Sequence, residues 1–299
     1  MTATKPLAQR IQHFYDTSSP LWERTWGEHM HHGYYGLTGR HRKDRRQAQV
    51  DLIEELLAWA GVTSANTILD VGCGIGGSTL YLANKFDAQA VGITLSPVQA
   101  QRAGERAAEK GVTLQAWENF DASEAPAVQF QVTNALSTPF PTNSFDFVWS
   151  MESGEHMPDK QAFLQECYRV LKPGGTFLMA TWCHRPTDTL AGPLTESEQQ
   201  HLDRLYELYH LPYVIDLNTY GKLAVEVGFS DIAMADWSRQ VEFFWLDVVR
   251  SALDINVMAG IVQAGMETIR GTAAIALMTT GFDRGLIRYG LLRGTKQAD

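Results

Sequence analysis

Residues 68–77 read Ile-Leu-Asp-Val-Gly-Cys-Gly-Ile-Gly-Gly, an apolar run that leads directly into a glycine-rich turn. Three of the four residues before Gly72 are apolar, which indicates a buried parallel strand, and a helical pattern resumes at 78–83. Glycines at such a turn allow the backbone to approach a ligand closely. This succession of strand, turn and helix predicts where a nucleotide-type cofactor binds.

The glycine spacing fits two cofactor classes. The dinucleotide fingerprint G-x-G-x-x-G fits from Gly72 to Gly77, and the S-adenosylmethionine (SAM) version G-x-G-x-G fits from Gly72 to Gly76. A dinucleotide site also needs an acid about twenty positions later, at the end of the second strand. Strand 88–93 is followed by Thr-Leu-Ser instead, and the acid precedes the glycines, at Asp70. This order favours SAM and leaves a NAD-dependent oxidoreductase as the alternative.

The run around the glycines, followed at 92–99 by Gly-Ile-Thr-Leu-Ser-Pro-Val-Gln, resembles SAM-dependent methyltransferases. The resemblance implies that Asp70 faces the methionine part of SAM and that Thr94 and Gln99 hold the ribose. It also places Asn134 at the adenine, where many relatives have an Asp. The SAM-binding residues that we expect are Tyr15, Asp70, Gly72, Gly74, Gly76, Thr94, Leu95, Gln99, Asn134, Ala135 and Ser150.

The composition is that of a globular protein with a sizeable core: 299 residues, 44% hydrophobic and 20% charged. No apolar stretch approaches the roughly 18 residues of a membrane span, and the N-terminus has no apolar signal-peptide core. Cys73, Cys167 and Cys183 are odd in number and lie in segments of core-like composition, so we expect buried thiols. These features predict a soluble, cytoplasmic chain without a membrane span.

The net charge of −9 argues against nucleic acid as a substrate, because a protein that neutralises many phosphates needs a clustered basic surface. The basic run at 40–46 is short, and we interpret it as the solvated start of a helix. A small molecule is therefore the expected partner. The sequence leaves homo-oligomerisation open.

Strands and helices alternate downstream of the glycine turn, as in βαβ units. We expect helices at 97–110 and 160–171 and strands at 130–133, 145–150 and 176–181. The predicted fold class is α/β, with a parallel, doubly wound, Rossmann-like sheet.

Four parts are expected along the chain. These are an N-terminal helical cap at 1–60, a SAM-binding core at 61–185, a lid or substrate-binding insertion with one core strand at 186–272, and a final core strand with a C-terminal segment at 273–299. Two apolar runs, 274–280 and 286–292, would supply the last strand and a closing element.

Residues 114–127 interrupt the core more than a short loop would, and we interpret them as an insertion. Trp117 and Phe120 within it either cover the adenine ring or pin the loop to the core.

Carboxylates and a histidine gather after the fourth strand, where 150–157 reads Ser-Met-Glu-Ser-Gly-Glu-His-Met. Ligands bind at this carboxyl edge in open α/β folds. Methyl transfer to an acceptor that carries a proton requires a group that removes the proton. The catalytic candidates are Glu152, Glu155 and His156. His156 is favoured as base or orienter because the unperturbed pKa of histidine lies near neutral pH. For Glu155, a cap on the next helix without a catalytic role is the alternative.

Aromatic residues and histidines are dense at 14–35, before the sheet begins. We interpret this segment as a cap over cofactor and acceptor, with Tyr15 hydrogen-bonded to the methionine end of SAM. His29, His31 and His32 lack the i,i+4 pairing of helical metal ligands and a matching Cys/His cluster, so no metal site is expected. These histidines either belong to the cap or are polar filling.

Longer motifs extend the resemblance over nearly the whole chain. Residues 14–35, 148–160 and 235–238 resemble the γ-tocopherol C-methyltransferases and their relatives, which include plant indole-alkaloid N-methyltransferases and bacterial natural-product C-methyltransferases. The resemblance implies a seven-stranded Rossmann-like methyltransferase that uses SAM and no metal. It also implies that the Glu-x-x-Glu-His segment deprotonates the acceptor.

The expected activity is therefore SAM-dependent methyl transfer to a small, largely apolar or aromatic acceptor. C-methylation of a prenylated phenol or tocopherol-like ring is the first hypothesis, and N-methylation of an indole or another alkaloid is the alternative. A non-catalytic SAM-binding module is a further alternative of a different class.

Overall fold

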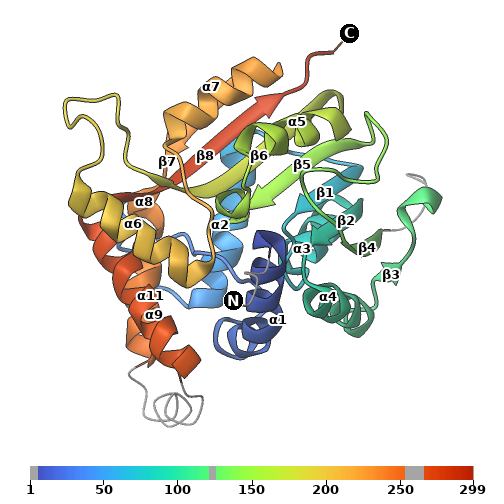
Figure 1. The fold of residues 1–299 in the computed structure, drawn as a ribbon. Helices are drawn as coiled ribbons and strands as arrows, with labels where there is room; N and C mark the ends of the chain where they lie inside the picture. The colour runs from blue at the N-terminus through green and yellow to red at the C-terminus, as the bar shows by residue number, and fades with distance from the viewer. Residues whose placement is uncertain (1–5, 121–125, 253–265, 299) are drawn as a thin grey trace.

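The structure, a computed structural model, describes residues 6–120, 126–252 and 266–298 (Figure 1). Within these ranges the strands form one eight-stranded sheet of order β3-β4-β2-β1-β5-β6-β8-β7. They are β1 (Thr67–Val71), β2 (Gln89–Thr94), β3 (Thr113–Leu114), β4 (Ala127–Val132), β5 (Phe145–Met151), β6 (Leu171–His184), β7 (Ser230–Asp236) and β8 (Ile287–Thr295). The first six pair in parallel, and β8 pairs antiparallel with β6 and β7. The α/β prediction is confirmed. The strand number was wrong, because the two-residue β3 adds an edge to the seven expected strands.

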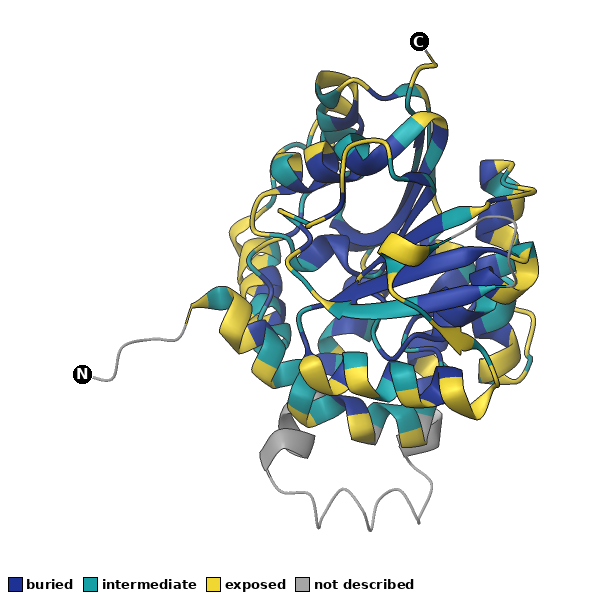
Figure 2. Cartoon of the chain, turned by 90° about the vertical axis from the view of Figure 1, so that its right-hand side faces the viewer, coloured by how far each residue is buried: buried dark blue, intermediate teal, exposed yellow. Residues whose placement is uncertain are grey.

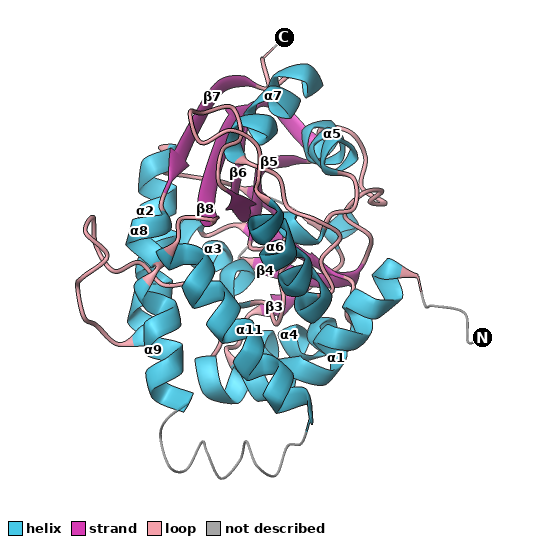
Figure 3. Ribbon diagram, turned by 60° about the vertical axis from the view of Figure 1, so that its left-hand side comes forward, coloured by secondary structure: helices cyan, strands magenta, loops and turns pink. Residues whose placement is uncertain are grey.

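Helices flank both faces of the sheet (Figure 3). They are α1 (Leu7–Trp26), α2 (Arg45–Ala60), α3 (Gly77–Phe86), α4 (Pro97–Glu109), α5 (Lys160–Val170), α6 (Glu196–Tyr209), α7 (Leu217–Val227), α8 (Ser238–Val241), α9 (Phe243–Ala252) and α11 (Met266–Asp283), with short 3₁₀ turns η1 (Trp117–Asn119) and η2 (Gly154–His156). Polar residues define several helix starts: the Ser96 hydroxyl accepts from the Gln99 backbone N–H at α4, and Asp159 accepts from the Ala162 N–H at α5.

Alternate residues of the central strands enter two different cores. Ile68 and Phe147 face the core shared with α2, α3, α6, α9 and α11, whereas Leu69 and Val148 face the core shared with α5 and α7. Such burial on both faces is typical of parallel strands between helical layers. In Figure 2 the central strands are accordingly mostly buried and the outer helix faces exposed.

The two apolar runs near the C-terminus form different elements. Residues 274–280 belong to helix α11, and 286–292 lead into β8, which is therefore the last strand. Strand β7 lies within residues 186–272, where one core strand is expected. Residues 253–265 of the same part lie outside the described residues.

The 114–127 segment contains the end of edge strand β3 and the turn η1, and its residues 121–125 lie outside the described ranges. Trp117 packs edge-on against buried Phe140, with ring centroids 5.4 Å apart. Trp117 and Phe120 both pack against the core next to α5. They pin this segment to the protein rather than covering the adenine site.

Cys73, Cys167 and Cys183 are buried free thiols, as expected. No helix in the described part of the chain is long and apolar enough to cross a bilayer.

Candidate active site

A cavity of about 220 Å³ lies at the carboxyl ends of β1, β2, β4 and β5. The strand order places it at a switch point, because the chain leaves β1 for β2 on one side and later returns to β5 on the other. All the predicted site residues line the cavity except Gly76 and Ser150. Segments that are far apart in the sequence therefore meet where the glycine turn predicts a ligand.

Gly76 and Ser150 lie behind the cavity wall. Gly76 has a φ of +80°, and a Cβ there would stand 2.8 Å from the Phe130 ring and 2.9 Å from Ala103 Cβ. This glycine therefore lets α3 start close to β4 and α4. The Ser150 hydroxyl lies 2.8 Å from that of Ser153, which donates to the Val71 carbonyl at 2.7 Å. The serines tie the loop after β5 to β1.

The glycine turn leaves open space on its cavity side. Gly74 has a φ of +52°, and a Cβ there would have no heavy atom nearer than the Gln99 Nε2, 4.0 Å away. A Cβ on Gly72, whose φ is +87°, would instead stand 2.3 Å from Ser153 Cβ. Gly72 is thus required by close backbone approach, and Gly74 leaves room for a ligand above the turn.

Polar groups surround this open space. Buried Asp70 accepts a 2.6 Å hydrogen bond from the Thr79 hydroxyl, and burial raises the pKa of its carboxyl to about 7. At the end of β2, the Thr94 hydroxyl donates to Gln99 Oε1 at 2.7 Å. The structure therefore brings together the two residues predicted to hold the ribose.

Asn134 is exposed at the end of β4, beside buried Ala135. Its side-chain oxygen accepts from the Leu136 N–H at 3.0 Å within its own turn. The amide nitrogen is the group left for a ligand, so Asn134 would donate where an Asp would accept.

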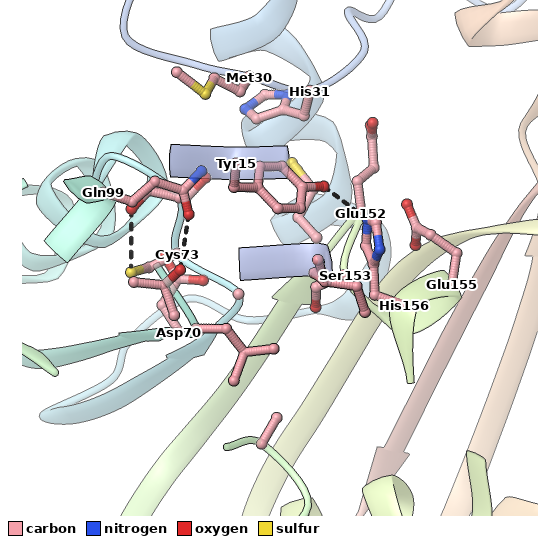
Figure 4. A pocket seen from close by; sticks show the side chains of 18 of the residues that line it. Tyr15, Met30, His31, Asp70, Cys73, Gln99, Glu152, Ser153, Glu155 and His156 are labelled. Atoms are coloured by element: carbon pink, nitrogen blue, oxygen red, sulfur yellow. Dashed lines mark hydrogen bonds between the residues drawn. The ribbon is translucent and has the colours of Figure 1, made fainter. Parts of the chain in front are cut away.

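Helix α1 lines one side of the cavity and is held there by hydrogen bonds to α4 and its cap. Its Ser19 hydroxyl accepts from Gln99 Nε2 at 3.0 Å, its Glu23 binds Arg102 at 2.8 Å, and its Asp16 binds Ser96 of the α4 cap. In Figure 4, Tyr15 lies between Gln99 on one side and the loop after β5 on the other. The cap is thus fastened to α4 by several side chains along one face.

The glycine turn, Asp70, Thr94, Gln99 and Asn134 fit SAM. The open space above Gly74 lets backbone approach a ligand, the Thr94–Gln99 pair offers a hydroxyl and an amide at the neighbouring strand end, and Asp70 supplies a carboxyl beside the turn. Leu95, half-buried, adds an apolar contact on the same wall.

Glu152 is a buried carboxylate with three donors. Its oxygens accept from the His32 backbone N–H at 2.8 Å, from His32 Nδ1 at 2.9 Å and from the Tyr289 hydroxyl at 3.0 Å. Burial opposes ionisation, but the nearby His32 imidazole and the two hydrogen bonds from His32 outweigh it and lower the pKa of Glu152. Glu152 is therefore a fixed negative charge that joins the N-terminal segment to β8.

Glu155 has the opposite electrostatic character. Its side chain is buried and accepts from the Thr181 hydroxyl at 2.8 Å. Burial, followed by repulsion from Glu152, raises its pKa to about 7. The alternative of a helix cap is not what the structure shows, because Asp159 caps the next helix, α5, and Glu155 lines the cavity.

His156 Nε2 lies 2.7 Å from the Tyr15 hydroxyl (Figure 4), and its Nδ1 is buried with no hydrogen-bond partner among the described residues. Burial, with nearby Lys160 and His210, lowers the pKa of His156 to about 3. Burial also raises the pKa of Tyr15, which keeps its proton. The premise of a near-neutral pKa was wrong: His156 is a neutral hydrogen-bonding group.

Sequence reasoning missed an aromatic wall around His32. The His32 ring lies 4.8 Å from the ring of Phe244, 5.1 Å from Trp245 and 6.1 Å from Trp182, between centroids. The three aromatic side chains line the cavity together with Tyr209. Nothing in the sequence marks these positions as site residues, because aromatic residues on buried strands and helices usually belong to the core.

The neighbouring histidines are buried near α2. The rings of His29 and His31 are 5.1 Å apart, and burial lowers the pKa of each imidazole. Gln49 Nε2 donates to the backbone carbonyls of both. Across the described part of the chain, no group of three or more His, Cys, Asp or Glu side chains is arranged to hold a metal.

Comparisons with known proteins show that this chain is similar to methyltransferases. The family model described as "Methyltransferase domain" matches residues 69–179. A probable tocopherol O-methyltransferase, chloroplastic, of Oryza sativa is 44% identical over 96% of this chain and 77% of its own. The tocopherol O-methyltransferase, chloroplastic, of Arabidopsis thaliana is 41% identical over 97% and 83%. The 2-methyl-6-phytyl-1,4-hydroquinone methyltransferase of Synechocystis is 32% identical over 94% and 85%.

Among solved structures, a putative sarcosine dimethylglycine methyltransferase from Galdieria sulphuraria has a TM-score of 0.78. It is 24% identical, and the match covers 95% of this chain and 99% of that one. This likeness supports the fold. The predicted cytoplasmic location stays a prediction.

Proposed function

The chain belongs to the family of SAM-dependent methyltransferases that includes the tocopherol methyltransferases, and from this premise we propose that it methylates a ring carbon of a prenylated phenol or hydroquinone. Its cofactor is SAM. The alternative of a NAD-dependent oxidoreductase is therefore excluded. When bound, SAM supplies an electrophilic methyl group. The residues that would hold it are those around the glycine turn, with Asp70, Thr94 and Gln99 as the polar contacts.

The cavity supports an acceptor that is mainly apolar and aromatic but carries oxygen. Trp182, Phe244 and Trp245 give flat apolar walls next to the loop after β5. The indole N–H groups of Trp182 and Trp245 are buried and have no acceptor among the described residues. Two buried donors without partners are costly unless a ligand accepts from them. The relatives named for tocopherol and for a phytyl hydroquinone suggest such a ligand, with ring oxygens and an apolar chain.

Glu155 is the residue that we propose removes the phenolic proton of the acceptor. A buried carboxyl with a pKa of about 7 is half ionised at neutral pH and accepts a proton more readily than an ordinary glutamate. Loss of the phenolic proton raises the electron density of the ring carbons beside the oxygen, which makes them nucleophilic. His156, neutral and bonded to Tyr15, would orient the acceptor oxygen through Nδ1. Glu152 holds its charge and sustains the raised pKa of Glu155.

The direct test is incubation with methyl-labelled SAM and a panel of prenylated hydroquinones, tocopherols and indoles, followed by mass spectrometry and NMR of the products. We expect a new ring methyl group on a product that keeps its phenolic hydroxyl. A methyl ether as the product would contradict the ring-carbon proposal. Turnover of indoles alone would replace it by N-methylation.

The pH dependence of the wild-type enzyme follows from Glu155. Its carboxylate must be ionised to accept the proton, so kcat should fall as the pH is lowered through about 7. Below that limb we expect about a tenfold loss per pH unit. Initial rates at saturating SAM and acceptor, between pH 4 and 9, measure the position of this limb. A limb near pH 4.5 would assign the titration to an ordinary carboxyl.

Thr94→Val is expected to weaken SAM binding by about five- to tenfold, since it removes a hydroxyl of the proposed ribose pair, worth roughly 1 kcal/mol. Isothermal titration calorimetry measures the Kd. Thr113→Val, on the exposed edge strand β3, is the matched control and should bind SAM as the wild type does. Equal affinity in both variants would remove Thr94 from the SAM site.

A further inference from the structure

Lys160 has a buried ammonium group directly behind η2, the Gly154–His156 turn. It begins α5, is 2% exposed, and donates to the backbone carbonyls of Gly154 at 2.9 Å and Glu155 at 3.0 Å. The Tyr213 ring covers the ammonium, with its centroid 4.8 Å from Nζ. Both accepting carbonyls belong to η2, the turn that presents Glu155 and His156 to the cavity.

A buried charge needs compensation, and the groups around Lys160 show where it comes from. Besides the two carbonyls and Tyr213, the titratable neighbours are Glu155 and His156 on the turn itself and Cys183 on β6. The Tyr220 hydroxyl of α7 also donates to the Gly154 carbonyl, at 3.3 Å.

The charge of Lys160 acts on both site residues. It lowers the pKa of Glu155, opposing burial and Glu152, and it contributes to the low pKa of His156. Burial in turn lowers the pKa of Lys160 to about 8, while Glu155 opposes this shift. Lys160 therefore remains mostly protonated at neutral pH, and its cation is available to the turn.

We propose that Lys160 is a positioning residue for methyl transfer: its ammonium fixes the Gly154–His156 turn through two backbone carbonyls and places a positive charge behind the Glu155 carboxyl. This inference rests on the proposed role of Glu155 as the proton acceptor. A lysine that only stabilised the start of α5 would affect unfolding but not the ionisation of Glu155.

Two variants separate the charge from the hydrogen bonds. Lys160→Gln keeps an N–H donor, on a side chain one atom shorter, but removes the charge, and Lys160→Met removes both. Without the cation, the fall of kcat at low pH, its acid limb, should begin about one pH unit higher in both variants. This shift lowers kcat about tenfold at pH 6 and less than twofold at pH 9, relative to the wild type. At pH 9 the Met variant alone should remain at least about threefold slower, because its turn has lost both donors.

Lys222→Met is the control, since Lys222 is an exposed α7 lysine, 68% accessible, that pairs with Asp188 and does not line the cavity. It should keep the wild-type pH profile. SAM Kd and thermal unfolding are measured for every variant, and the Gln variant provides the test if the Met variant does not fold. A folded Gln variant with normal SAM affinity and an unshifted acid limb would overturn the proposal.

The wild type and Glu155→Gln are assayed in parallel, so that the inference and its premise fail differently. If Glu155→Gln keeps wild-type turnover, the proton-acceptor role is wrong. If it loses turnover while the limb of Lys160→Gln stays in place, only the role of Lys160 is wrong.

Discussion

Glu155→Gln should lower kcat by about 100-fold or more and leave the Kd of SAM within about twofold. The amide has nearly the shape of the carboxyl and can still accept from the Thr181 hydroxyl, but it cannot take up the acceptor proton. In this variant the acceptor must give its phenolic proton to water. The ring carbons then carry far less electron density when the methyl group is transferred. The loss should therefore appear in kcat rather than in cofactor binding.

Single-turnover assays with a hydroquinone acceptor measure the rate, and calorimetry measures SAM binding. Glu226→Gln is the matched control, because Glu226 is exposed on α7 away from the cavity. The residual activity of Glu155→Gln should also lose the limb near pH 7, since the titrating group is gone. A variant that keeps more than a tenth of wild-type kcat would move the proton-acceptor role elsewhere, with Glu152 as the next carboxylate to test.

The glycine turn and its neighbours were predictable because they are local. A strand, a tight turn and a helix lie within about twenty residues, so sequence order alone brings Asp70 beside the glycines. The pairing of Thr94 with Gln99 is local too, as the helix after β2 starts between them. Parallel strands end at the same edge, which places the loop after β5 there as well.

The chemistry of that loop was not predictable, since it depends on burial and on distant segments. Glu152 meets His32, 120 residues earlier, and Tyr289, 137 residues later. Burial exchanges the expected roles of Glu155 and His156, raising one pKa to about 7 and lowering the other to about 3. No spacing rule contains these effects, which arise only when the cap and the last strand enclose the site.

Glu152→Gln should be the most destabilising of the conservative changes in the site, with a loss of about 3–5 kcal/mol in the free energy of unfolding at pH 7. The carboxylate is 9% exposed and accepts from three donors, two on His32 and one on Tyr289. An amide presents its own N–H to some of these donors, which leaves them buried and unpaired. Because the native pKa of Glu152 is lowered, its contribution is complete above the unfolded pKa, about 4.3, and is lost as the pH falls through the native value.

Denaturant unfolding of both proteins from pH 3 to 8 measures this. The difference in stability should be constant near neutral pH and shrink below about pH 4. Tyr289→Phe, which removes one donor and leaves the charge in place, should cost only about 1 kcal/mol, and Glu226→Gln should change stability by less than about 0.5 kcal/mol. A Glu152→Gln loss no larger than that of Tyr289→Phe would mean that the His32 contacts contribute little. The N-terminal segment would then be held over the site mainly by the aromatic packing of His32 against Phe244 and Trp245.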